Sequence, residues 1–414
     1  MSPPSTSPQS RLPLRFNELA LLAAIVVVVI ITAAVDSNHS YLRQPYTSFR
    51  DIARNVALLG IFALGAGVVI IAGGIDLSAG SMIAFSGTVC ASTMMLLAPE
   101  TMINMRPVGP LVAFCGIAAA ILSGFLVGTL HAWLITAVRL PPFVATLATL
   151  VGLRSFARAL CGYVTAKTLG GSGNTEINVY DPYFSFIRDH IWYVYVPVFV
   201  ALAAFTYLLL GSTVLGRHIY ALGGNEEAAR LSGIRTDRVK WFAYCFSAVT
   251  ASIAGVFYVA DQSVASPVNQ GVGYELNAIA AAVVGGCSLQ GGIGTVPGII
   301  FGVVFLRVVI DSVAKLIKSG SDIYEGMIVG IVVVLAVTFG QIRQIRASGR
   351  QLFPGMLGVI AIPTLALSIG IITAMTTANV TYLKGLDVWI GLGVALVVLL
   401  TLASVKLTQV SSKP

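Results

Sequence analysis

Charged side chains are scarce in this chain of 414 residues. Asp, Glu, Lys and Arg together make up 10% of it, whereas apolar residues make up 57%. A soluble fold of this length could not bury so much apolar surface. Apolar runs of about 17 to 25 residues, enough to cross a hydrocarbon core of about 30 Å, recur along the chain. The alternating pattern of a membrane β-barrel is absent. The composition therefore predicts an all-α, polytopic helical membrane protein.

Side chains able to catalyse a reaction or bind a metal are also few and lie far apart. The four histidines show no metal-ligand spacing, and the five cysteines lie mostly in or beside apolar runs, where we expect buried free thiols. The net charge of +8 is typical of membrane proteins with positive cytosolic loops. We therefore predict no catalytic residue, no metal site and no cofactor on this chain. The residues concerned are His39, His131, His190, His218, Cys90, Cys115, Cys161, Cys245 and Cys287.

The apolar runs predict about twelve membrane spans in a chain whose N-terminus is cytosolic. Residues 1–18 are rich in Ser and Pro and form an expected disordered cytosolic tail. A signal peptide is the alternative for the first run, but this run is long and no small-residue cleavage site follows it. Residues 19–341 form the expected core domain, and residues 342–414 form an extension with two further spans. The predicted spans are Leu19–Val35, Val56–Ala72, Ser81–Leu97, Pro110–Ala137, Pro142–Leu160, Ile191–Leu210, Trp241–Ala260, Leu276–Leu289, Val296–Val313, Tyr324–Gly340, Gly355–Met375 and Val388–Val405.

The polar segment Thr213–Lys240 interrupts these apolar runs and predicts a short capped helix in the cytosol. Asn225 is a plausible N-cap because its side chain can accept a hydrogen bond from the first turn. Glu226 and Glu227 follow, where the positive end of the helix dipole favours acids. Gly233 is placed to end the helix, since only glycine turns left-handed without steric cost. A cytosolic partner docking on this helix would explain why it interrupts the spans.

Two glycine-rich stretches predict helix breaks: Gly73–Gly80 (GGIDLSAG) and Gly285–Gly292 (GGCSLQGG). Their shared pattern suggests an internal duplication, with binding near the interface of the two repeats. The preceding run Leu276–Leu289 is short, and it either crosses the membrane or re-enters it. The candidate pathway residues in and beside the breaks are Gly73, Gly74, Asp76, Ser78, Gly80, Glu275, Asn277, Gly285 and Gly286.

The acidic and amide side chains at these breaks each allow two interpretations. An intramembrane carboxylate such as Asp76 indicates a functional site. Alternatively, Asp76 caps the following half-helix by accepting hydrogen bonds from N–H groups near Ser78 and Gly80. Glu275 and Asn277 either shape an outer gate or cap the helix that follows, and the sequence leaves this open.

A family resemblance rests on four motifs: GGIDLSAGSMIAFSG, LPPFVATLATL, LGRHIYALGGNEEAARLSGI and YELNAIAAAVVGGCSLQGGIGTVPG. Over roughly Asn55 to Gln341 the chain resembles the permease subunits of ribose-type ABC importers. The resemblance implies a permease that pairs in the bacterial cytoplasmic membrane with a second copy or a paralogue. It also implies two cytosolic ATPase domains on a partner subunit, which carry the ATP and Mg²⁺, and an extracytoplasmic sugar-binding protein. Family substrates are mainly monosaccharides, some related polyols and a furanose-like signalling molecule.

The resemblance also assigns a role to the polar segment. Residues 216–234 match the family's ATPase-contacting loop, and the chain has no P-loop of the form G-x-x-x-x-G-K-[ST], so hydrolysis is expected on another chain. Asn277 departs from the family, which commonly has Asp there, and the C-terminal extension also departs from it. The implied coupling residues are Gly216, Arg217, Gly223, Gly224, Asn225, Glu226, Ala229 and Gly233.

Two other function classes compete with this hypothesis. An ion-coupled secondary transporter of a small polar solute also uses broken helices and a midplane site. It needs intramembrane ion ligands, for which Asp76 is the clear candidate. A membrane-embedded enzyme needs a nucleophile with a base, or a metal constellation, and the sequence has neither. The identity of the sugar and of the second permease copy cannot be derived from this chain.

Overall fold

The computed structural model describes residues 16–36, 38–171, 173–316, 353–378 and 385–411, with isolated residues between 326 and 338. Ten of the described helices are long and apolar enough to cross a membrane. This confirms the predicted polytopic helical class. The ten are α1 (Phe16–Val35), α3 (Pro45–Ile71), α4 (Ala79–Leu97), α6 (Pro110–Thr136), α7 (Pro142–Leu169), α9 (Tyr195–Ser212), α12 (Thr236–Gln262), α14 (Val296–Leu316), α16 (Gly355–Ala378) and α17 (Asp387–Ser411).

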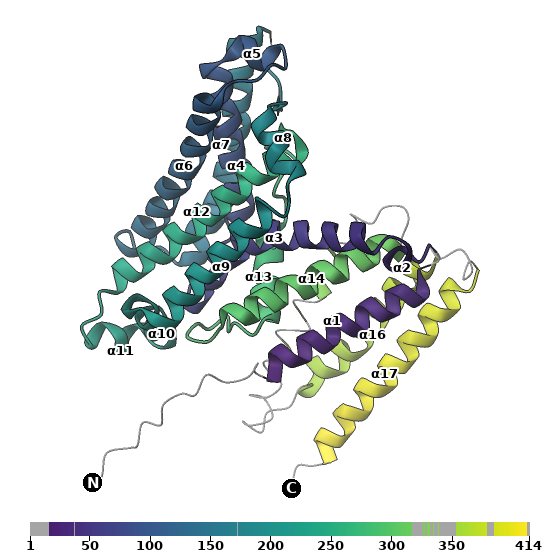
Figure 1. The fold of residues 1–414 in the computed structure, drawn as a ribbon. Coiled ribbons are helices and arrows are strands. Elements are labelled where there is room, and N and C mark those ends of the chain that lie inside the picture. Colours follow the sequence, from purple (N-terminus) through teal and green to yellow (C-terminus); the bar gives the residue numbers. More distant parts are fainter. Residues whose placement is uncertain are drawn as a thin grey trace. The chain divides into compact units, whose positions relative to one another are not determined.

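The chain divides into two compact units, residues 1–31 with 40–309 and residues 32–39 with 310–414. In the first unit, α12 packs against α3, α4 and α6, and α4 also packs against α7 (Figure 1). The most apolar window of α3 is 83% buried, whereas that of α7 is only 17% buried. Therefore α3, with α4 and α12, forms the protein core, while most residues in the apolar window of α7 are not buried within this unit.

Glycine residues allow the central helices to approach each other closely. A Cβ atom added at Gly128 of α6 would lie 2.5 Å from the Cα atom of Cys245 in α12. One added at Gly255 of α12 would lie 2.6 Å from the carbonyl oxygen of Ile83 in α4. These contacts between backbones are the small-residue packing by which helices associate in lipid.

Several short elements lie in the loops of this unit. Strand β1 (Ile177–Asn178) pairs antiparallel with β2 (Val264–Ala265), and α8 (Pro182–Asp189) is capped by Asp181, whose Oδ1 accepts from the Tyr183 N–H at 2.9 Å. The other short helices are α2 (Ser40–Arg43), α5 (Pro99–Ile103), α10 (Val214–Gly224), α11 (Glu226–Leu231) and α13 (Tyr274–Val284).

Helix α13 forms most of the predicted run Leu276–Leu289. It has 11 residues, and at about 1.5 Å per residue it spans about 17 Å, roughly half of a hydrocarbon core of about 30 Å. The chain turns after Val284 and enters α14 at Val296. Helix α13 is therefore a half-helix, too short to cross the hydrocarbon core without the chain on either side of it.

In the second unit, α16 and α17 pack along each other as a helical hairpin. The Lys406 ammonium near the end of α17 donates to the Gly355 carbonyl at the start of α16 (2.9 Å). A Cβ atom at Gly370 would lie 2.7 Å from the Gly391 carbonyl oxygen, so these helices also approach at glycine. The two extra C-terminal helices are thus confirmed. The predicted span Tyr324–Gly340 lies mostly outside the described residues, as does most of the predicted tail, whose residues 16–18 belong to α1.

Candidate functional site

The polar segment Thr213–Lys240 contains two short helices, where the sequence predicted one. Helix α10 precedes α11, and α12 begins at Thr236. The Thr213 hydroxyl caps α10 by accepting from the Gly216 N–H at 3.0 Å. The sequence analysis missed this cap, although a threonine directly before a helical stretch is a usual N-cap signal. As a result, Gly216, Arg217, Gly223 and Gly224 lie on a helix of their own.

Helix α11 has the predicted caps at both ends. The Asn225 side chain accepts from the Ala228 N–H at 2.9 Å, which confirms it as N-cap. Gly233 has φ +84° and follows the helix, and the Ile234 N–H closes the last turn on the Ala229 carbonyl at 3.1 Å. These bonds satisfy backbone groups that the helix ends leave free. The short helix is therefore held rigidly at both termini.

Two ion pairs fix the acidic first turn of α11. The Lys240 ammonium of α12 contacts the Glu226 carboxylate at 2.5 Å and so ties α11 to α12. The Arg230 guanidinium contacts Glu227 at 2.6 Å, and this hydrogen bond raises the pKa of Arg230 above its ordinary value. The Glu226–Lys240 pair is partly exposed and contributes at most about 1 kcal/mol, whereas the Arg230–Glu227 pair is largely exposed and screened by solvent.

The predicted coupling residues differ in their exposure. Ala229 is 4% exposed, and Gly216 is buried. Gly216 packs so closely against α9 that a side chain there would collide with the carbonyl oxygens of Leu209 and Leu210. Gly223 is half-buried. The other predicted coupling residues are exposed and form the surface that a partner could contact. The exposed ones are Arg217, Gly224, Asn225, Glu226 and Gly233.

Both helix breaks and the end of α10 meet at one point, which we call the glycine junction (Gly73, Gly223, Gly291 and Gly292). A Cβ atom at Gly291 would lie 2.6 Å from the Gly223 carbonyl oxygen and 2.7 Å from the Gly73 Cα atom. The Gly292 N–H donates to the Ile71 carbonyl at the end of α3 (2.8 Å). Three segments far apart in sequence are thus in direct backbone contact, with no space for a side chain between them.

The sequence prediction included Gly73 and Gly223 but not the partners that bring them together. Gly291 and Gly292 form the second glycine pair of GGCSLQGG, and this repeated pair was the available signal. The Tyr220 hydroxyl of α10 adds a further link, because it donates to the Gly294 carbonyl at 2.8 Å.

The two breaks end their helices with the same cap, displaced by one residue from the shared sequence pattern. That pattern aligns Gly73 with Gly285, but the left-handed residues are Gly73 (φ +82°) and Gly286 (φ +95°). Each of these donates its N–H to the carbonyl three residues earlier at 2.9 Å. Gly74 and Gly285 instead lie where a side chain would collide, with Tyr244 and with Gly298 respectively. The common cap is local helix-end geometry, which two unrelated segments can share.

Asp76 is 3% exposed, and both of its carboxylate oxygens accept hydrogen bonds. One oxygen accepts from the Ser78 N–H (2.9 Å) and hydroxyl (2.6 Å). The other accepts from the Ser247 hydroxyl of α12 at 2.7 Å. The predicted bond to the Ser78 N–H is present, but Ser78 is itself the N-cap residue of α4 and no side chain caps this helix, so Asp76 closes the turn that precedes α4. The bond to Ser247 adds a tie from the first break to the central helix, which no local sequence signal indicates.

Polar side chains of α6 and α7 surround this break. The Thr146 hydroxyl of α7 donates to the Ile75 carbonyl at 3.2 Å. His131 of α6 is fully buried, its Nε2 lies 2.7 Å from the Thr149 hydroxyl, and its Nδ1 has no hydrogen-bond partner among the described residues. Such a buried polar group within apolar helices marks a functional region by default.

Glu275 and Asn277 of α13 are 8% and 6% exposed. Neither is the N-cap of α13, because that position is Gly273 and no side chain caps the helix. The Glu275 Oε2 atom is buried without a hydrogen-bond partner among the described residues. It lies beside Gly80 of α4, where a side chain would collide with it and with the Gly271 carbonyl. Gly80 thus makes room for the carboxylate, and the role of Glu275 in a gate stays a prediction.

Across the part of the chain that the structure describes, no three His, Cys, Asp or Glu side chains gather as a metal site. The structure describes all five cysteines as free thiols. The arrangement instead offers buried hydrogen-bonding groups, half-helices and a capped surface helix joined by a backbone junction.

Broken helices, intramembrane polar groups and a rigid polar surface helix together define a membrane transport permease. Residues 48–337 match the family model described as "Branched-chain amino acid transport system / permease component", so the chain belongs to this family.

Curated relatives cover most of the chain. The ribose import permease protein RbsC of Escherichia coli K12 is 33% identical over 331 residues, which is 78% of this chain and 93% of that protein. RbsC of Bacillus subtilis is 32% identical over 323 residues, covering 78% and 92%. The autoinducer 2 import system permease protein LsrC of Yersinia pseudotuberculosis YPIII is 33% identical over 328 residues, covering 79% and 86%. No solved structure matches the chain significantly.

Proposed function

We propose that this chain is the membrane permease subunit of an ABC importer for a monosaccharide or a related polyol. The observation that carries the proposal is the family membership together with relatives named for the import of ribose and of autoinducer 2, matched along about four fifths of the chain. The names of these relatives denote import-system permeases and not ion-coupled carriers. This favours the ABC importer over the secondary transporter that broken helices alone allow.

In this proposal, ATP binds and is hydrolysed on a separate cytosolic ATPase subunit. Helix α11, capped at both ends and exposed, is the element that the ATPase contacts. Motion of α11 would pass through Asn225 to Gly223 at the end of α10, where the glycine junction joins the end of α3 and the loop after α13. Both breaks would then move together, and the buried groups at Asp76 and Glu275 would line the path that opens.

The remaining partners follow from the same assignment. A second copy of this chain or a paralogue would complete the pathway in the bacterial cytoplasmic membrane, and an extracytoplasmic binding protein would deliver the sugar. The N-terminus, the segment Thr213–Lys240 and the C-terminus would lie in the cytosol. The supporting observation is the concentration of Lys and Arg in that segment.

Reconstitution tests the proposal directly. The chain would be purified with the ATPase and the binding protein of the same importer and placed in liposomes, and uptake of labelled ribose, xylose, galactose and autoinducer 2 would be measured. We expect uptake only with ATP in the compartment that holds the ATPase, and no ATP hydrolysis by this chain alone. Uptake that follows a proton or sodium gradient without the ATPase would contradict the proposal.

A further inference from the structure

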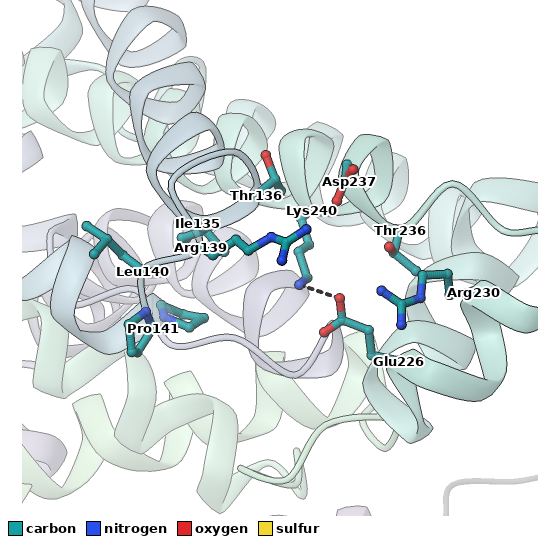
Figure 2. Close-up of a pocket in the computed structure, with 11 residues that line it drawn as sticks. Ile135, Thr136, Arg139, Leu140, Pro141, Glu226, Arg230, Thr236, Asp237 and Lys240 are labelled. Atoms are coloured by element: carbon teal, nitrogen blue, oxygen red, sulfur yellow. Dashed lines mark hydrogen bonds and ion pairs between the residues drawn. The ribbon is translucent and has the colours of Figure 1, made fainter.

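The described residues form a pocket of about 480 Å³ between the turn that joins α6 to α7 and the start of α11 and α12. Figure 2 shows its two walls, with Arg139 and Pro141 on one side and Glu226 and Arg230 on the other. Five charged side chains line it. They are Arg139, Glu226, Arg230, Asp237 and Lys240.

Most of these charges already have a partner. Glu226 pairs with Lys240, and Arg230 pairs with Glu227 next to the pocket. Asp237 lies in the first turn of α12, where the helix dipole stabilises its negative charge. Arg139 is exposed, and no ion pair or hydrogen bond of its guanidinium occurs among the described residues. Its side chain extends across the pocket toward α12 (Figure 2). The pocket therefore offers one unpaired cation to a ligand.

The backbone at Arg139 makes this side chain unusual. Arg139 has φ +62°, and the chain around it closes the end of α6, with the Leu140 N–H donating to the Leu134 carbonyl at 3.0 Å. This left-handed position after a helix is normally occupied by glycine, because a side chain there is strained. Because this backbone conformation favours glycine, an arginine at the position indicates that its guanidinium has a function.

The turn also connects the pocket to the transport pathway. Its residues Leu140, Pro141 and Pro142 begin the motif LPPFVATLATL. This motif lies outside the polar segment Thr213–Lys240 and has no role in the proposal so far. Later in the same motif, Thr146 bonds the Ile75 carbonyl of the first break. A contact made at the turn is thus one and a half helical turns away from the break.

We propose that the α6–α7 turn is a second contact site for the cytosolic ATPase subunit, and that Arg139 pairs there with an acidic side chain of that subunit. This inference rests on the proposed function, because it needs the ATPase and a cytosolic position of Thr213–Lys240. The turn and α11 form the two sides of the pocket that the ATPase would contact. A displacement of the turn would move α7 directly, because α7 begins at Pro142.

The test measures binding of the importer's ATPase subunit to the full-length chain in nanodiscs. One set is made of phosphatidylcholine alone and the other also contains phosphatidylglycerol. We expect Arg139→Glu to raise the apparent Kd about tenfold in both lipids. Arg139→Gly should raise it about fivefold, as expected for the loss of one partly exposed pair. Because glycine relieves the left-handed strain, a loss in this variant does not reflect misfolding.

Arg106→Glu is the matched control, because Arg106 is an exposed arginine in the loop before α6, at the opposite end of that helix. We expect it to bind the ATPase like the unmodified chain. A photo-crosslinker at position 139 should label the ATPase, and reversing the labelled acidic residue to Arg should restore binding to Arg139→Glu.

Unchanged binding in both Arg139 variants would overturn the proposal. An effect confined to phosphatidylglycerol nanodiscs would also overturn it and would identify a lipid headgroup as the ligand. Failure of the unmodified chain to bind the ATPase would reject the proposed function as well, and so the two failures can be told apart.

Discussion

Substituting Gly223 with alanine tests the glycine junction most directly. The added Cβ atom would lie 2.5 Å from the Gly292 amide nitrogen and closer still to the Ile71 carbonyl oxygen. Real Cβ atoms essentially never approach other atoms within 3.0 Å, so the Gly292 backbone must retreat by at least 0.5 Å (3.0 minus 2.5 Å). Both obstacles are backbone atoms, which cannot rotate aside as a side chain could.

The expected cost follows from what this displacement breaks. Gly292 and Ile71 share a hydrogen bond of 2.8 Å, directly at the point of collision. Leaving these groups unpaired costs about 1–3 kcal/mol, and overpacking a tight contact costs about 1–3 kcal/mol more. We therefore expect Gly223→Ala to lower the free energy of unfolding by about 2–6 kcal/mol, or to separate α10 from the second break and relieve the strain in that way.

The assay compares thermal unfolding with ATP-driven uptake in the reconstituted importer. Gly211→Ala in α9 is the control, since a Cβ atom there meets nothing within 4 Å and a helical Gly-to-Ala change stabilises by about 0.5–1 kcal/mol. We expect Gly223→Ala to lose at least about tenfold in coupled uptake, a barrier increase of about 1.4 kcal/mol. A Gly223→Ala protein with the stability and uptake of the unmodified chain would refute the junction as a mechanical contact.

Substitutions at three further residues probe the elements around the junction. Asn225→Ala removes the cap of α11 and should destabilise that helix by about 1 kcal/mol; hydrolysis per transported sugar should rise, whereas Asn225→Asp, which keeps the acceptor, should not change it. Asp76→Ala leaves three buried donors unpaired and should destabilise the chain by about 3 kcal/mol or more. Asp76→Asn keeps an acceptor and should fall in between, and equal unfolding of the two variants would contradict a stabilising role of the hydrogen bonds that Asp76 accepts. Glu226→Gln breaks only a partly exposed ion pair, so its stability should change by less than about 1 kcal/mol in thermal unfolding.

Local signals in the sequence predicted the local parts of the site. The caps of α11 depend on residues within a few positions of each other, and so Asn225 and Gly233 could be assigned from the sequence alone. The apolar runs predicted the spans for the same reason, because burial in lipid requires a continuous apolar stretch.

The sequence did not predict the start of α3, because that part of the helix makes a contact with a residue far away in the sequence. Helix α3 begins at Pro45, eleven residues before the predicted span at Val56, because its polar first turns continue the helix beyond the apolar stretch. Arg54 in these turns pairs with Asp261 of α12 at 3.1 Å, a partner 207 residues away. Hydropathy reports where a helix is apolar and not where it ends.

The same limitation applies to the glycines of the coupling segment. Gly223 and Gly224 are adjacent and indistinguishable in the sequence, yet a side chain at Gly223 collides with two other segments and one at Gly224 meets nothing within 4 Å. Local propensity therefore cannot rank them. The ranking exists only once α3 and the loop after α13 are placed against the end of α10.

Two contacts could transmit force from α11: the Glu226–Lys240 ion pair and the glycine junction. The Glu226–Lys240 pair joins two flexible side chains, and the Glu226 side chain is 49% exposed, so it yields under load at a cost below about 1 kcal/mol. The junction joins backbone to backbone, and close-packed interiors transmit displacement because they have no space to absorb it. If force passes through the junction, Glu226→Gln retains coupling and Gly223→Ala loses it. The reverse order would assign the transmission to α12 through Lys240, and the two breaks would then have to be moved through Asp76 and its bond to Ser247.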